Sequence, residues 1–176
     1  MKYISREDIE RRAHELLRSH DAYEVPVPLE LVAHRLGLKV QRVPLGESIS
    51  GVLVLSDGGG MIGVNSDQPE VRQRFTIAHE LGHFLLHKGK SELFIDRTFV
   101  AFRNSSSATG KERVEIQANQ FAAALLMPEE LLSREAMDMV IDLAEGDLIN
   151  TLADRFGVSS QSMTFRLENL KMLGPA

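Results

Sequence analysis

Apolar side chains recur at intervals of three and four residues along most of this 176-residue chain. Because an α-helix has about 3.6 residues per turn, this spacing places them on one face of a helix. Ser5 is a favourable N-cap residue, Pro28 suits a first helical turn, and Gly37 suits the end of a last turn. The predicted helices follow Ser5, span residues 28–36, 69–87 and 111–127, follow Pro128, and span residues 147–156 and 160–170.

Three shorter runs, residues 38–43, 51–55 and 60–65, are rich in β-branched and aliphatic side chains and predict strands. The turn sequence Ser-Asp-Gly-Gly separates the last two, so they are expected to form a β-hairpin. Residues 97–111 contain a run of Asn, Ser and Gly and predict a loop. The expected fold class is therefore α+β, mostly helical, with a small three-stranded sheet.

Composition narrows the possible chemistry. Apolar residues make up 43% and charged residues 26%, as in ordinary globular proteins, and the net charge of −5 disfavours nonspecific binding to nucleic acid or anionic membranes. The chain has no cysteine, which excludes disulfides, thiol catalysis and thiolate zinc sites. No run of 18 apolar residues and no signal-peptide pattern occurs, so we expect a cytoplasmic protein without a membrane span.

The pattern His79-Glu80-Leu81-Gly82-His83 lies inside the predicted helix 69–87. Histidines four residues apart share one helix face, so both imidazoles can reach a single metal ion. Glu80 is rotated from His79 by roughly 100° about the helix axis, which places its carboxylate beside the metal rather than on it. This arrangement is typical of zinc hydrolases, in which the glutamate accepts a proton from the attacking water.

A catalytic zinc site requires a third protein ligand. His87 is too far along the same helix, since three successive turns span about 12 Å. On the next long helix, Glu115 and Asn119 share a face, so Glu115 could bind the metal while Asn119 accepts a hydrogen bond from a ligand histidine. Asp96 and Glu112 remain alternative acidic ligands.

Residues 72–87, RQRFTIAHELGHFLLH, and residues 115–128, EIQANQFAAALLMP, resemble the two signatures of the ImmA/IrrE family of metallo-endopeptidases. The resemblance implies a gluzincin-like, zincin-type peptidase with His79, His83 and Glu115 as zinc ligands and Glu80 as the general base. Manganese or iron can also occupy such a ligand set. We expect residues 1–135 to form this peptidase domain and residues 136–176 a helical extension.

Known members of that family cleave helix-turn-helix repressors during stress or mobile-element induction, and others pair with such a partner in toxin–antitoxin-like systems. The resemblance therefore implies that the substrate is a helix-turn-helix repressor or antitoxin, encoded nearby. The alternative is a regulatory or toxin protein that sequesters this partner without proteolysis. Glu80 argues against the alternative, because a purely structural metal site does not need a base at that position.

The C-terminal extension also has the pattern of a helix-turn-helix, with Gly157 in the turn and apolar Met163 and Leu167 on the following helix. From residue 147 onward, however, three basic and three acidic side chains leave no net charge. Such a segment makes a weak phosphate-binding surface. We therefore expect these helices to pack against the domain or dock a partner, rather than bind DNA directly.

Overall fold

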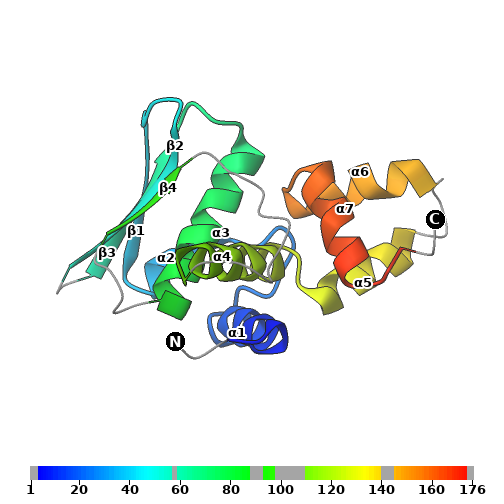
Figure 1. Ribbon diagram of the computed structural model, residues 1–176. Coiled ribbons are helices and arrows are strands. Elements are labelled where there is room, and N and C mark those ends of the chain that lie inside the picture. The colour runs from blue at the N-terminus through cyan, green and yellow to red at the C-terminus, as the bar shows by residue number, and fades with distance from the viewer. Residues whose placement is uncertain (1–3, 57–58, 88–92, 98–109, 140–144, 174–176) are drawn as a thin grey trace.

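The computed structural model describes residues 4–56, 59–87, 93–97, 110–139 and 145–173 (Figure 1). Within these residues, seven helices and four strands confirm an α+β fold that is mostly helical. The elements are, in chain order, α1 (Arg6–Ser19), α2 (Leu29–Arg35), β1 (Leu38–Val43), β2 (Ile49–Ser56), β3 (Gly59–Asn65), α3 (Glu70–His87), β4 (Leu93–Arg97), α4 (Gly110–Leu126), α5 (Glu129–Met139), α6 (Glu145–Phe156) and α7 (Ser160–Asn169).

The sheet has the strand order β1-β3-β2-β4. β2 and β3 form the expected antiparallel hairpin, with Gly51 opposite Val64 and Ser56 opposite Gly59. β1 runs parallel to β3, and β4 runs antiparallel to β2 at the other side of the hairpin. The predicted number of three strands is therefore wrong, because the sheet contains a fourth strand, β4.

The additional strand β4 has only five residues, too few to stand out by periodicity alone. Its alternation becomes evident on the sheet, where Leu93 and Ile95 are 50% and 47% exposed while Phe94 is half-buried between them. Hydrogen bonds to β2 stabilise this short strand. Of the loop predicted at residues 97–111, the part at 98–109 lies outside the described residues.

Helix α3 packs on one face of the sheet, α4 packs on α3, and α1 packs on α4 (Figure 1). The sheet contributes Leu53, Ile62 and Val64 to this core, and all three side chains are fully buried. Helix α3 contributes Ile77 and Leu81, which are equally buried. The predicted metal-binding motif thus lies on a helix that is enclosed by the sheet and by α4.

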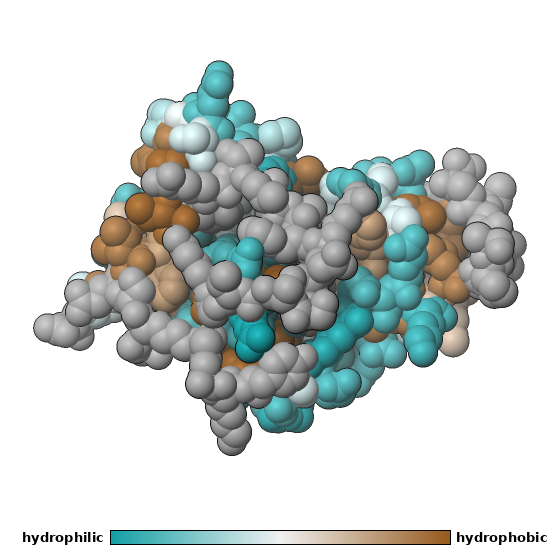
Figure 2. Space-filling view, in the orientation of Figure 1, coloured by the Kyte–Doolittle hydropathy of each residue, from teal (hydrophilic) through white to brown (hydrophobic). Residues whose placement is uncertain are grey.

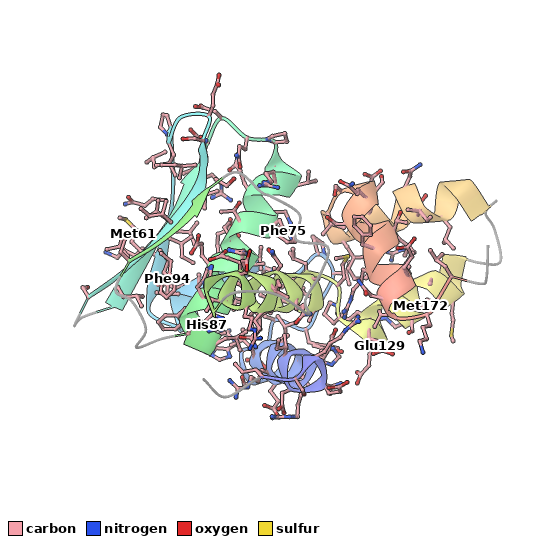
Figure 3. All side chains as sticks on the ribbon, in the orientation of Figure 1. Met61, Phe75, His87, Phe94, Glu129 and Met172 are labelled. Carbon is pink, nitrogen blue, oxygen red and sulfur yellow. The ribbon has the colours of Figure 1, made fainter. Side chains whose placement is uncertain are left out.

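The other face of the sheet carries exposed apolar side chains. Val54 is aligned with Met61 on β3 and with Leu93 on β4, and the three are 39%, 37% and 50% exposed. Figure 2 shows the corresponding hydrophobic surface at left, and Figure 3 shows Met61 pointing away from the helices. Among the described elements, the helices therefore cover one side of the sheet only.

The C-terminal helices α5, α6 and α7 lie beside the helical layers, on the side away from the sheet (Figure 1). Helices α6 and α7 confirm the predicted pair around Gly157. The division into two domains at residue 135 falls inside α5 and stays a prediction. No helix in the described part of the chain combines the length and apolar character that a membrane span requires.

Candidate metal centre

His79 and His83 lie on one face of α3 and point toward α4, as their spacing predicts. Each side chain is only 2% exposed. Their Nε2 atoms are 2.9 Å apart, and the two rings meet edge to face with centroids 4.6 Å apart. Two buried imidazole nitrogens therefore converge on one point.

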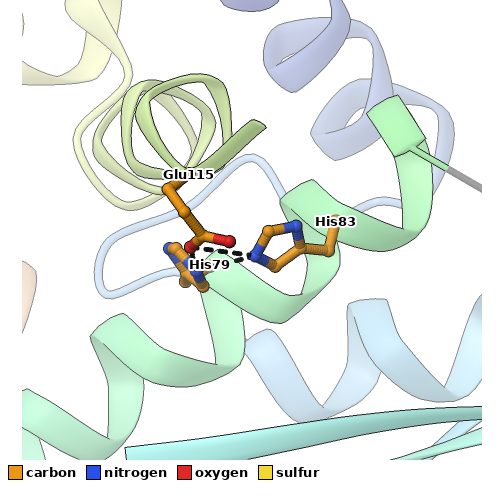
Figure 4. A group of neighbouring side chains, drawn as sticks. All are labelled: His79, His83 and Glu115. Atoms are coloured by element: carbon orange, nitrogen blue, oxygen red, sulfur yellow. Dashed lines mark hydrogen bonds and ion pairs between the residues drawn. The ribbon is translucent and has the colours of Figure 1, made fainter. Parts of the chain in front are cut away.

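Glu115 reaches the same point from α4 (Figure 4). Its Oε2 atom is 3.3 Å from His79 Nε2 and 3.5 Å from His83 Nε2. Zinc ligands at about 2.0–2.1 Å in a tetrahedron are separated by about 3.3 Å, so the two histidine–glutamate distances fit a shared ion. Among the described residues, these three form the group able to hold a metal, and we call them the metal centre.

The other residues considered as metal ligands are two acids and a third histidine. Glu112 lies on α4 one turn before Glu115 and does not belong to the metal centre. Asp96 lies in β4, and its side chain is outside the described residues. His87 is the last residue of α3, where it is fully buried with its ring centroid 5.8 Å from that of His83. It is also not part of the metal centre.

The charge state of Glu115 also suits a cation. Burial by itself would raise the pKa of this carboxyl group, but hydrogen bonds and charge interactions with His79 and His83 outweigh that effect. The pKa of Glu115 therefore lies well below its usual range. The metal centre offers a carboxylate anion to any ion placed between the two imidazoles.

Asn119 orients one of the histidines. It lies one turn after Glu115 on α4, and its Oδ1 atom is 2.8 Å from His79 Nδ1. Because an amide oxygen only accepts hydrogen bonds, Nδ1 of His79 must carry the proton in this contact. In the neutral ring the Nε2 atom of His79 then carries the lone pair, which faces the metal centre, and this is the tautomer that a metal ligand requires.

A close approach of α3 and α4 brings Glu115 within reach of the histidines. A Cβ atom placed on Gly82 would lie 3.1 Å from the Cα and from the carbonyl oxygen of Ala118, and 3.3 Å from the Cβ of Phe121. Ordinary carbon contacts are about 3.5–4.0 Å, so a side chain at Gly82 would push the helices apart. The small residue Ala118 on α4 thus faces a glycine on α3.

Sequence reasoning missed the contribution of Phe94 to the site. Its ring stacks on that of His83, with centroids 4.7 Å apart and an interplanar angle of 21°. Figure 3 shows Phe94 on the side of the sheet that faces α3. The run of three apolar residues at 93–95 was the available signal, but it identifies a contact to His83 only once β4 is placed beside β2.

Glu80 is fully buried on α3, between the two histidines in sequence but on a different face. A Cβ atom on Gly51 of β2 would lie 3.3 Å from its Oε1 atom, so the carboxylate is directed toward the sheet. This position agrees with the rotation expected for the residue after the first histidine. Glu80 is therefore not a member of the metal centre but lies next to it on the same helix.

Comparison with known proteins agrees with this geometry. The family of IrrE N-terminal-like domains, Peptidase_M78, matches residues 33–168. The chain belongs to this family. It therefore shares a family with proteins that are classed as metallopeptidases, and both signature runs noted in the sequence lie within the matched residues.

Two known proteins have sequences similar to this chain. Metallopeptidase ImmA of Bacillus subtilis (strain 168) is 32% identical over 98 residues, which cover 56% of this chain and 50% of the relative. Uncharacterized immunity region protein 2 of Bacillus phage phi105 is 27% identical over 112 residues, which cover 64% of this chain and 65% of the relative. The chain thus spans between half and two thirds of their lengths.

The fold also resembles a solved structure, a Mycobacterium tuberculosis transcriptional regulator, with a TM-score of 0.58 and 19% sequence identity. The similarity covers 92% of this chain and 46% of the regulator. At this identity, the likeness concerns the fold alone. It includes most of the described elements, from the N-terminal helices to the C-terminal ones.

Proposed function

We propose that this chain is a zinc-dependent endopeptidase with His79, His83 and Glu115 as metal ligands and Glu80 as general base. The observation that carries the proposal is the convergence of two buried imidazoles and one ionised carboxylate, from two helices, in a member of a metallopeptidase family. Such a three-ligand set leaves a coordination position open for the reaction, as in catalytic rather than structural zinc sites.

The donor atoms fit zinc. Two neutral imidazole nitrogens and one carboxylate oxygen are a common catalytic zinc set, and Asn119 fixes the tautomer of His79 that the set needs. Manganese or iron are the other ions that this set can hold. When bound, the ion supplies Lewis acidity toward the peptide carbonyl and toward water.

The protein's own groups then account for the proton transfers. The Glu80 carboxylate removes a proton from the attacking water and returns it to the amine of the departing peptide. Its burial beside the sheet keeps bulk water from competing for that proton. Phe94, stacked on His83, limits rotation of that imidazole and keeps its Nε2 atom directed at the metal centre.

The substrate we propose is a helix-turn-helix repressor or antitoxin. The resemblance of the two signature runs to ImmA/IrrE peptidases, known members of which cleave such repressors, supports this choice. An extended segment of the substrate can add to the sheet at the edge strand β4, whose Phe94 contacts the metal centre. The second candidate function, sequestration of the partner without cleavage, is disfavoured by the buried Glu80.

The test combines the zinc-loaded protein with the helix-turn-helix protein encoded beside its gene and analyses the fragments by mass spectrometry. We expect one discrete cut that disappears with Glu80→Gln, a substitution that removes the base but no metal ligand. Zinc content, measured by atomic emission, should be the same in both proteins. Cleavage at the wild-type rate by Glu80→Gln would refute the mechanism, and a stable uncut complex would favour sequestration.

A further inference from the structure

A groove of about 820 Å³ lies beside the metal centre, between α3, α4, α1 and α7. Its walls include the first turns of α3, the middle of α4 and the beginning of α7. Asn119 belongs to this wall and also contacts His79 at 2.8 Å. The groove and the metal centre are therefore neighbours that share the side chain of Asn119.

Part of the groove is apolar. Phe165 of α7 is 49% exposed and Val71 of α3 is 38% exposed, and both line the groove together with Phe75 and Ile116. Figure 3 shows Phe75 on the side of α3 toward the C-terminal helices. A half-exposed phenylalanine is unfavourable in water, and an apolar side chain inserted against it would bury both surfaces.

The rest of the groove is positively charged. Among the described residues its lining contains Arg6, Arg72 and Arg166 and the acid Glu10, in a chain whose net charge is −5. Arg166 and Arg6 both contact Glu10, and Arg72 donates a hydrogen bond to Ser50 Oγ at 3.2 Å. The N-terminus of α7 also lines the groove and adds its positive helix-dipole end. These charges favour an acidic occupant.

The groove is preformed, because the buried Arg166 and the half-buried Arg74 hold the helices that enclose it. Arg166 of α7 is 3% exposed, pairs with both carboxylate oxygens of Glu10 on α1, and donates to the Met127 carbonyl at 2.9 Å. Arg74 of α3 donates to the Gly157 carbonyl at 3.2 Å, in the turn before α7. Binding of a peptide therefore requires no ordering of these helices, which would otherwise reduce its affinity.

We propose that this groove is a substrate subsite for a peptide segment that carries a bulky apolar side chain next to an aspartate or glutamate. The inference rests on the proposed peptidase function and adds the side-chain preference on one side of the scissile bond. The apolar side chain contacts Phe165 and Phe75, and the neighbouring carboxylate faces Arg72 and the start of α7. Because Asn119 borders both sites, a peptide held at the metal centre has to extend only past this side chain to place its next residues in the groove.

The experiment measures cleavage and binding separately, with the zinc-loaded full chain. A mixed synthetic peptide library is digested with the wild type, Phe165→Ala and Arg72→Glu, and the cut sites are sequenced by mass spectrometry. In parallel, the same library is passed over immobilised Glu80→Gln protein, with and without the groove substitutions, and the retained peptides are identified. Leu31→Ala and Lys39→Glu serve as matched controls, since both residues are exposed and lie outside the groove.

We expect the wild type to cut, and the immobilised Glu80→Gln protein to retain, peptides in which a bulky apolar residue is followed or preceded by an acid. Phe165→Ala should lower the ratio of bulky to small residues at that position by about tenfold. Arg72→Glu should exchange the acidic preference for a basic one, which a general loss of folding cannot mimic. The controls should keep the wild-type profile.

Two outcomes separate this inference from the proposed function. Active cleavage whose residue preferences are the same in wild type, Phe165→Ala and Arg72→Glu would overturn the subsite and leave the peptidase intact. Retention of apolar, acidic peptides that depends on Phe165 and Arg72, without any cleavage by the wild type, would support the subsite and refute the peptidase. Neither cleavage nor selective retention would overturn both.

Discussion

Substitution Gly82→Ala tests whether the spacing of α3 and α4 controls the metal centre. The new Cβ would lie 3.1 Å from the Cα of Ala118, against about 3.5–4.0 Å for a relaxed carbon contact, so α4 must move by about 0.5 Å. Glu115 is three residues from Ala118 on the same helix, and its carboxylate moves with it. Ligand distances in a zinc site tolerate about 0.2 Å, so zinc affinity should fall by about tenfold or more.

The effect of Gly82→Ala on stability combines two opposing contributions. Overpacking a well-filled helix contact costs about 1–3 kcal/mol, whereas alanine is favoured over glycine in a helix by about 1 kcal/mol. The net loss is therefore up to about 2 kcal/mol, which corresponds to a decrease in Tm of up to about 8 °C for a chain of this length. Competition with a chromophoric chelator measures the zinc affinity, and circular dichroism measures the melting.

Gly63→Ala on β3 is the matched control, because among the described residues the nearest atom to its new Cβ would be the carbonyl oxygen of Val52 at 3.8 Å. It makes the same chemical change without the close helix contact, and it should leave zinc affinity unchanged. Unaltered zinc affinity and a raised Tm in Gly82→Ala would refute the reasoning. That result would mean that α4 has room to accept a methyl group without displacing Glu115.

Three further predictions concern the metal and the C-terminal helices. Asn119→Ala should weaken zinc binding by about 10–100-fold, because His79 loses the acceptor that selects its tautomer; chelator competition measures this, and unchanged affinity would contradict it. If the free zinc concentration is about 1,000 times Kd, removing the zinc should lower the free energy of unfolding by about 4 kcal/mol and the Tm by roughly 8–16 °C in a calorimetric scan. Coincident melting curves with and without zinc would argue against a metal site. Arg166→Ala should cost about 2–4 kcal/mol in urea unfolding, since the partly buried Glu10 loses its bidentate partner and, among the described residues, keeps only the contact with Arg6 at 4.0 Å. Arg11→Ala, which breaks exposed pairs within α1, should have a much smaller effect; equal losses would show that α7 is not anchored by Arg166.

Features that depend on neighbouring residues in the chain could be predicted from the sequence. Ser5 caps α1 by accepting a hydrogen bond from the backbone N–H of Asp8 at 3.1 Å, as its position suggested. The hairpin of β2 and β3 follows from two apolar runs around a turn sequence. His79 and His83 share a face because four residues make about one helical turn, whatever surrounds the helix. These features are local, so short-range sterics and periodicity are sufficient to specify them.

Features that join distant segments depended on the tertiary structure. Spacing along the chain left Asp96, Glu112 and Glu115 as candidate ligands, and only the crossing of α3 and α4 at Gly82 and Ala118 brings the Glu115 carboxylate to both imidazoles. The strand β4 is too short to be recognised without the hydrogen bonds that β2 provides. The groove likewise depends on contacts between distant segments, such as those of Arg166 with Glu10 and of Arg74 with Gly157. In each case the deciding contact is between residues far apart in sequence, whose proximity comes from packing rather than from any local pattern.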